Sequence, residues 1–210
     1  MKRSIFGTLK RVVRSTRGDS MLQTTASIAA ATIVAGATVP AVSSYMTRAK
    51  ESRASSEVKS TATMIHALMA DLGKGNIPRA SDDSRALALM ATPGIVPPTE
   101  AGDGNFWTAP LTDPAVGDLN AYLYTNAVGF KEKASPLHGR GWCGPYLDSI
   151  LESDPWGNRY MVSIGLFGRR NTAVAIVVSA GADGVLSVPY NMTRVQTTEE
   201  HGDDIFYPLE

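Results

Sequence analysis

The stretch SMLQTTASIAAATIVAGATVPAVSSYMT, residues 20–47, decides the fold expected for this chain. It carries no charged side chain and exceeds the roughly 20 apolar residues that cross the hydrocarbon core of a bilayer as a helix. Residues 1–18 precede it with six basic side chains and no acidic one. A basic leader before an apolar run is typical of export or membrane insertion, because the cations stay on the cytoplasmic side.

Two interpretations of this leader differ in where it is cut. An ordinary secretory signal would end in small residues near 35–41, and the apolar run would be removed. A cut after Gly18 would instead leave the run attached and make Asp19 the first residue of the mature chain. Pro40 would then stand at position 22 of the mature chain. The alternative to a retained helix is therefore a secreted soluble domain.

Residues 20–72 are expected to form one long helix that changes character along its length. The first half is apolar all round, as in a helix buried in a membrane or a filament. Pro40 removes one backbone donor, so a kink or local melting is expected near 36–40. In the second half, apolar residues recur at steps of three and four, which predicts a stripe that packs on a globular domain. These residues are Val58, Ala62, Ile65, Met69 and Leu72.

Charge and cysteine content restrict the partners and the chemistry. Without residues 1–18 the chain keeps 14 basic against 20 acidic residues, a formal charge of −6. An acidic domain without a basic cluster argues against nucleic acid as a partner. Cys143 is the only cysteine, so no disulfide can form within the chain.

Short patterns after residue 73 indicate a small mixed domain. Two helical turns are expected over 85–91 and a short strand over 121–124. The apolar segments 159–164 and 172–179 predict an antiparallel hairpin that packs on the helical stripe. Between 154 and 157 the sequence has turn chemistry. Residues 180–210 are expected to be mostly loop.

The motif WCGP at 142–145 matches part of a thioredoxin active site. Dithiol exchange needs a second thiolate to resolve the mixed disulfide, and this chain has none. Nothing else in the sequence assembles a nucleophile with a base and an orienting acid. A monothiol redox protein thus stays as the enzymatic alternative, and the expected class is not an enzyme.

Acidic residues in the last third of the chain suggest a cation site. Asp183 lies in SAGADG (179–184), and Asp203 with Asp204 lies in GDDI (202–205). Loop carboxylates and backbone carbonyls suit calcium, which takes six to eight oxygen ligands in flexible geometry. Acidic turns with glycine are more often simply solvated, so this chemistry alone leaves both interpretations open.

Four ordered motifs, together with Gly18 and Pro40, resemble the type IV pilins, most closely the major pseudopilin of type II secretion systems. The motifs are GPYL (144–147), DPWGNRY (154–160), SAGADG (179–184) and DDI (203–205). The resemblance implies an α+β fold of the type IV pilin kind, with a long N-terminal helix packed on a small C-terminal antiparallel sheet and a structured acidic loop. It also implies a calcium site at Asp183, Asp203 and Asp204.

The resemblance further implies the organisation and role of the chain. Residues 1–18 would be a prepilin leader, 19–47 a transmembrane and filament-core half-helix, 48–73 an amphipathic half-helix, and 74–210 the globular head. A prepilin peptidase would cleave between Gly18 and Asp19. The product would be a single-pass inner-membrane subunit with its head in the periplasm. It would polymerise into a filament, in the periplasm or at the cell surface, with an inner-membrane assembly platform and minor pilins.

The first turn of the mature helix departs from the family pattern. The family usually has Phe or Met first and Glu fifth, and the Glu is thought to meet the N-terminal amine of a neighbouring subunit. Here these positions hold Asp19 and Gln23. An uncompensated amine in an apolar filament core would be costly. We therefore expect Asp19, Gln23 and Pro40 to matter for assembly, with Asp19 partly neutralising the amine beside it.

Overall fold

A computed structural model describes residues 16–79, 85–100, 106–134, 139–167, 173–198 and 201–209. In the first helix, the side chains of residues 16–20, 22 and 30–40 lie outside this description. Contacts divide the chain into one unit that ends at Thr47 and a second that runs from Arg48 to Glu210. Each unit is described separately below.

The first helix, α1, extends over Thr16–Leu72 and contributes to both units. It continues through Pro40 without a break, so the local melting expected there is absent. One missing hydrogen bond does not end a helix that has many turns on both sides. Within the part of the chain described with its side chains, no helix is long and apolar enough to cross a membrane. The side chains at 30–40, in the middle of the expected span, are outside that part.

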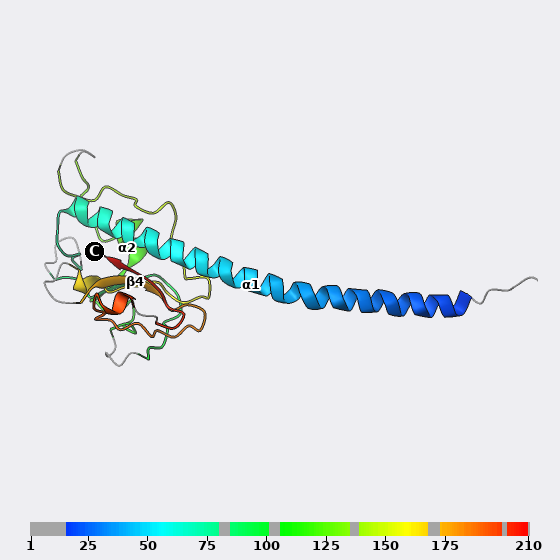
Figure 1. Ribbon diagram of the computed structural model, residues 1–210. Helices are drawn as coiled ribbons and strands as arrows, with labels where there is room; N and C mark the ends of the chain where they lie inside the picture. Colours follow the sequence, from blue (N-terminus) through cyan, green and yellow to red (C-terminus); the bar gives the residue numbers. More distant parts are fainter. Residues whose placement is uncertain are drawn as a thin grey trace, which may run out of the picture. The chain divides into compact units, whose positions relative to one another are not determined.

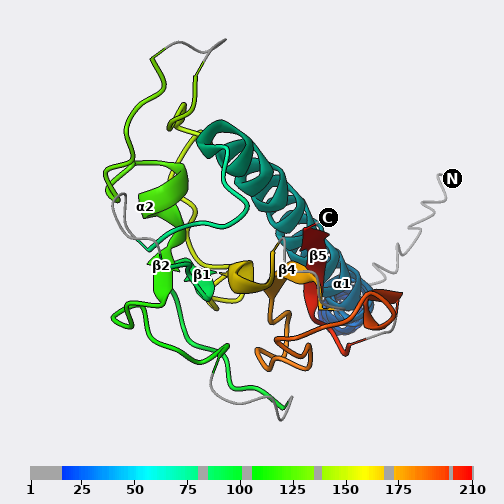
Figure 2. The same cartoon turned by 90° about the vertical axis from the view of Figure 1, so that its left-hand side faces the viewer.

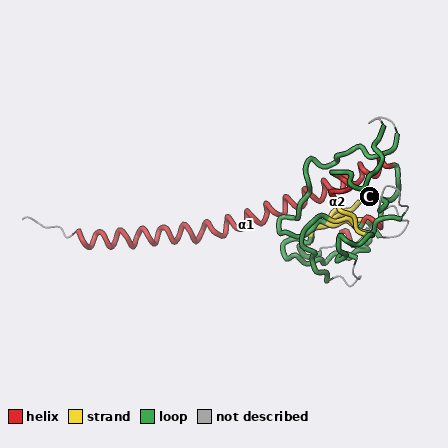
Figure 3. The backbone as a smooth tube through the Cα atoms, turned by 180° about the vertical axis from the view of Figure 1, so that it is seen from behind, coloured by secondary structure: helices red, strands yellow, loops and turns green. Residues whose placement is uncertain are grey.

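The second unit is an α+β domain built on one five-stranded sheet. Its strand order is β2-β1-β3-β4-β5, and Figure 2 shows β2, β1, β4 and β5 in this order. Loops and turns make up most of the rest of this unit (Figure 3). The elements after α1 are β1 (Leu89–Ala91), β2 (Val116–Asp118), α2 (Leu119–Leu123), β3 (Met161–Val162), η1 (Ile164–Leu166), β4 (Ala175–Ser179), η2 (Gln196–Thr198) and β5 (Ile205–Leu209).

The predicted packing of the amphipathic stripe is confirmed. All five of its residues are buried in the core with strands β1, β3 and β4. In Figure 1 the last turns of α1 lie alongside β4. The predicted hairpin is also present, since β3 and β4 are antiparallel neighbours. The mixed fold thus follows from a helical stripe that buries itself against strongly apolar strands.

The sheet is mixed rather than antiparallel, which corrects one part of the expected fold. Strands β1 and β2 pair in parallel, while the other three pairings are antiparallel. Parallel neighbours need a long crossover, and residues 92–115 supply one. The two helical turns expected over 85–91 are likewise wrong, because Leu89–Ala91 forms the buried strand β1 between β2 and β3.

Two further elements differ from expectation for local reasons. The strand expected over 121–124 is helix α2 instead, because the carboxylate of Asp118 caps it by accepting a hydrogen bond from the amide of Asn120. Strand β5 lies in the region expected to be loop. Its Pro208 obscured the pattern, but an edge strand tolerates proline because one side of its backbone has no ladder partner.

Candidate functional site

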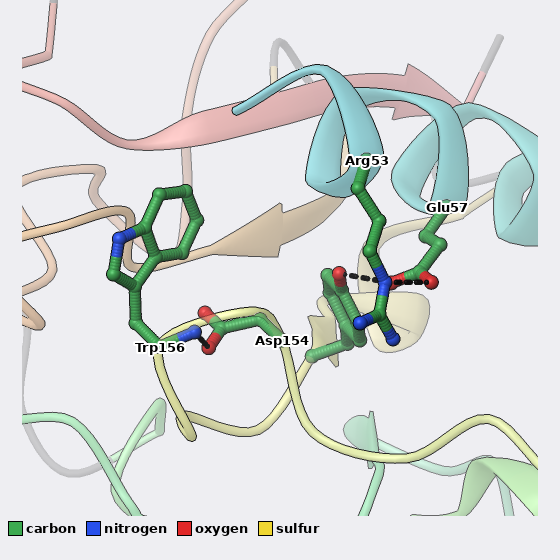
Figure 4. Close-up of polar contacts among 5 residues, drawn as sticks. Arg53, Glu57, Asp154 and Trp156 are labelled. Atoms are coloured by element: carbon green, nitrogen blue, oxygen red, sulfur yellow. Dashed lines mark hydrogen bonds and ion pairs between the residues drawn. The ribbon is translucent and has the colours of Figure 1, made fainter. Parts of the chain in front are cut away.

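The turn at 154–157 is organised by the buried carboxylate of Asp154. Its Oδ1 accepts hydrogen bonds from the amides of Trp156 at 3.0 Å and Asn158 at 2.8 Å. Its Oδ2 accepts from the hydroxyl of Ser179 at 2.6 Å, at the end of β4. Figure 4 shows the carboxylate pointing toward the amide of Trp156. Asp154 therefore joins two of the four motifs that carried the resemblance.

The same turn is tied to α1 by a second polar group. The hydroxyl of Tyr160 donates to the carboxylate of Glu57, which also pairs with Arg53 at 2.8 Å (Figure 4). Burial raises the pKa of Tyr160, and its hydrogen bond to Glu57 raises it further. The phenol therefore stays neutral and acts as the donor. This contact holds the helix, the hairpin and the turn in one arrangement.

The acidic residues of the third and fourth motifs meet in space. Asp203 Oδ2 accepts from the amides of Ala182 and, at 2.7 Å, of Asp183. Asp183 Oδ1 accepts from the amide of Val185 at 2.8 Å. Gly181 permits this approach, since a Cβ there would lie 2.2 Å from the carbonyl oxygen of Asp203. We call residues 181–188 together with 202–204 the acidic loop.

Asp204 is the most deeply placed acid of this loop. Its Oδ2 accepts from the amides of Ser187 and Val188, both at 2.8 Å. Its Oδ1 is buried and has no hydrogen-bond partner among the described residues. Burial raises the pKa of Asp204 to about 6, the two amides oppose this, and the charges of Asp203 and Asp183 add to it. Oδ1 of Asp204 therefore has neither a cation nor a hydrogen-bond donor beside it among the described residues.

An open groove of about 560 Å³ lies beside the acidic loop. Glu51 and Ser55 of α1 line one part of it, and Asp203 with Asp204 line another. Trp156 lies in the groove wall, so all three of the motifs at 154–160, 179–184 and 203–205 contribute to this region. The arrangement could attract and hold a cation.

The expected calcium ligands are thus brought together only in part. Asp183, Asp203 and Asp204 belong to one loop and influence one another electrostatically. However, among the residues that the structure describes, no three His, Cys, Asp or Glu side chains lie close enough to hold a metal ion by themselves. Each of the three carboxylates instead uses one oxygen to bind backbone amides. A metal here would need backbone or water oxygens as further ligands.

The remaining motif, GPYL, lies elsewhere. The hydroxyl of Tyr146 donates to Asp71 near the last turn of α1 at 3.0 Å, and Lys133 pairs with the same carboxylate at 2.8 Å. Cys143 is exposed, and loop rather than helix follows it. Tyr146 and Lys133 thus fasten residues near them to the end of α1, at a place remote in sequence from the acidic loop.

The residues expected to serve cleavage and assembly are described only by their backbone, with one exception. Gly18, Asp19 and Pro40 lie within α1, and their side chains are outside the described set. Gln23 is exposed, and its carbonyl oxygen accepts from the hydroxyl of Ser27 at 2.8 Å. Their roles in assembly therefore stay predictions.

Sequence reasoning missed a set of residues that contact the acidic loop. Residues 98–100 and 106–109, which we call the brace, pack on this loop. Arg159 is fully buried and donates to the carbonyl oxygens of Trp107 and Ala109. The sequence offered only a faint signal, namely a tryptophan within a long stretch without periodicity.

Comparisons with protein-family models, with curated proteins and with solved structures found no match for this chain. The resemblance to pilins therefore rests on the residues quoted for it.

Replacing Tyr160 by Phe should separate the hydrogen bond to Glu57 from the packing of the ring. We expect a loss of about 1 kcal/mol in the free energy of unfolding, because the half-buried carboxylate of Glu57 loses one of its two partners. Urea denaturation of a fragment that starts at Arg48 measures the change. Tyr207→Phe, at a side chain 40 % exposed on β5, should stay within about 0.5 kcal/mol. Equal losses in both variants would contradict the assigned role of Tyr160.

Proposed function

We propose that this chain is a structural subunit of a type IV pilin-like filament, similar to the major pseudopilin of type II secretion systems. The observation that carries the proposal is a row of exposed apolar side chains on the part of α1 before Arg48. Between 56 and 75 % of each is exposed, whereas the apolar stripe after Arg48 is buried. These side chains are Met21, Ile28, Val42, Tyr45 and Met46.

Exposed apolar side chains along a helix need another apolar environment to cover them. Four hydroxyl groups of this segment are compatible with an apolar environment, because each donates to a backbone carbonyl about one turn earlier in the helix. Thr25 donates to the carbonyl of Met21, and Thr47 to that of Ser43. Such back-bonding hides a polar group that would otherwise need water. Before assembly, lipid would cover these apolar side chains. After assembly, the α1 helices of neighbouring copies would cover them, because small residues allow helices to pack closely.

The proposal includes the processing and the partners implied by the resemblance. A prepilin peptidase cleaves between Gly18 and Asp19, and the subunit stays in the inner membrane by a single span with its head in the periplasm. An assembly platform and minor pilins then bring copies together into a helical filament. No catalytic step and no nucleic acid is part of this role.

The mature N-terminus tests this function most directly. The chain would be expressed in a host with a prepilin peptidase, purified from membranes, and its first residue identified by mass spectrometry. A start at Asp19, with or without a methyl group on its amine, is expected. A start near Thr38 or Val42 would instead show a secreted soluble domain, and the filament proposal would then be wrong.

Asp19 offers a sharper test within the same function. Its carboxylate is proposed to neutralise the adjacent amine in the filament core, where the family's Glu is replaced by Gln23. Asp19→Ala should lower filament yield markedly while membrane insertion continues, and Asp19→Glu should retain most of the yield. Sheared-filament assays and membrane fractionation report the two properties. A filament yield unchanged in Asp19→Ala would overturn the role of Asp19.

We propose in addition that the acidic loop binds calcium. The support is the buried Oδ1 of Asp204, which has no partner among the described residues, with two further carboxylates near it. Asp204 would bind the ion together with backbone carbonyls of the loop and water, and the negative charges of Asp183 and Asp203 would favour its binding. Bound calcium would supply a fixed positive charge that orders the loop.

A further inference from the structure

We propose that the brace, residues 98–100 and 106–109, is a positioning device for the acidic loop. It holds residues 186–188 in place so that Oδ2 of Asp204 accepts from two amides and the buried Oδ1, which has no partner among the described residues, is left for a cation. The ligand in this inference rests on the calcium proposal above. The effect of the brace on the order of the loop does not.

One end of the brace pairs with the acidic loop like a short strand. The amide of Leu186 donates to the carbonyl oxygen of Pro98 at 2.9 Å, and the amide of Glu100 donates to that of Leu186 at 2.9 Å. Thr99 faces Leu186 in a parallel bridge. Leu186 is fully buried, so these bonds are shielded from water.

The other end of the brace holds Val188 through a side chain. Trp107 is 1 % exposed, and its indole N–H donates to the carbonyl oxygen of Val188 at 3.0 Å. The ring also contacts Tyr190 edge-on, with centroids 5.2 Å apart. Arg159 also holds the brace, because its guanidinium donates to the carbonyl oxygens of Trp107 and Ala109. The indole is therefore held in one orientation.

The brace and Asp204 bind opposite sides of the same short segment. The amide of Val188 donates to Asp204, while its carbonyl oxygen accepts from Trp107. Leu186 is held by the brace just before Ser187, whose amide also donates to Asp204. Without the brace, the two amides would no longer be presented together to the carboxylate. Preorganisation of this kind lowers the ordering cost of binding.

The coupling between the brace and the cation is reciprocal. When the brace raises the affinity of the loop for a cation by some factor, the bound cation stabilises the docked brace by the same factor. In this proposal the function of the brace is to set the affinity of the acidic loop for a cation.

Trp107→Phe tests the inference in the full chain, solubilised in detergent, because it keeps a buried aromatic ring but removes the indole donor; the volume lost with the donor is matched by the control variant below. Hydrogen exchange of the backbone at 185–190 is measured in chelator, and the dissociation constant for calcium is measured by calorimetry. We expect protection at 185–190 to fall about tenfold and the calcium dissociation constant to rise about tenfold, as for one lost hydrogen bond to a buried acceptor.

Trp142→Phe is the matched control. Its indole also donates to a backbone carbonyl, that of Tyr122, at 3.0 Å and in a buried position. It should leave exchange at 185–190 and calcium affinity as in the parent chain. The inference is overturned if Trp107→Phe keeps full protection, or if Trp142→Phe lowers it equally. If the parent chain binds no calcium but Trp107→Phe still loses protection, the brace stands and only the calcium proposal falls.

Discussion

Asp154→Ala is expected to lower the free energy of unfolding by about 3 to 5 kcal/mol, the largest effect of any single change considered. The substitution removes one acceptor that serves three donors, the amides of Trp156 and Asn158 and the hydroxyl of Ser179. Asp154 is 4 % exposed, so water cannot replace the carboxylate without opening the turn. Each buried donor left unpaired costs about 1 to 3 kcal/mol. Urea denaturation of the fragment that starts at Arg48 measures the loss.

Two further variants separate the charge of Asp154 from its geometry. Asp154→Asn keeps an amide oxygen that can accept from both backbone amides, so we expect roughly half of the loss. Asp148→Ala removes an exposed carboxylate from a nearby loop and should change stability by less than about 0.5 kcal/mol. If Asp154→Ala were as mild as Asp148→Ala, the turn would not depend on its carboxylate.

Calcium should reverse the pH dependence that Asp204 gives to stability. The pKa of Asp204 is raised from 3.8 to about 6 in the folded chain. Because this pKa is higher in the folded state, protonation of Asp204 stabilises the folded state. This stabilisation is fully present below about pH 3.8 and is lost as pH rises through about 6. In chelator, acidification from about pH 7.5 to about pH 5 should therefore stabilise the fragment. Full linkage over this pH range would give about 1.4 kcal/mol, and because the group is partly exposed we expect about 0.5 to 1 kcal/mol.

With calcium present, acidification should lower the stability of the fragment instead of raising it. The ion favours the charged carboxylate and competes with protons, so its stabilisation is greatest near neutral pH and declines on acidification. At an excess of about 100 dissociation constants the gain is about 2.7 kcal/mol. Thermal unfolding of the fragment at both pH values, with calcium or chelator, measures all four states. Identical midpoints with calcium and chelator near neutral pH would contradict the proposed site.

Asp204→Asn identifies the group responsible for both effects. Its amide oxygen can still accept from Ser187 and Val188, but the side chain neither titrates in this range nor carries charge. We expect this variant to lose the acid stabilisation in chelator and most of the calcium effect. Asp113→Asn is the control, because Asp113 also accepts a backbone amide, that of Ala115 at 2.7 Å, outside the acidic loop. It should behave as the parent fragment.

The helix and the hairpin could be predicted because their signals are local and periodic. The stripe from Val58 to Leu72 repeats at helical spacing, and the segment around Ala175–Ser179 is β-branched and apolar, so each pattern favours one structure. Strands β1 and β2 could not be predicted in this way. They have three residues each, and their strand conformation is decided by pairing partners far along the chain.

The candidate site, too, could be predicted from the sequence only in part. The acids were visible in the sequence because carboxylates next to glycines mark a turn that could hold a cation. The role of Asp154 as a shared acceptor for Ser179 was not visible, since it depends on two segments that meet only in the fold. The brace was missed altogether, because its contacts with Leu186 and Val188 are backbone and indole hydrogen bonds, which leave no compositional pattern.

The apolar stretch 20–47 and the stripe after it determined by themselves that residues 20–72 form one long helix whose second half packs on a domain. Periodicity and the absence of charge are properties of the chain alone, and burial of apolar area acts on them wherever the partner lies. Only the tertiary structure decided which acid is buried, which oxygen of Asp204 stays unpartnered, and which residues hold the loop around it. Desolvation and hydrogen-bond geometry depend on distant segments, so they arise only once the chain has folded.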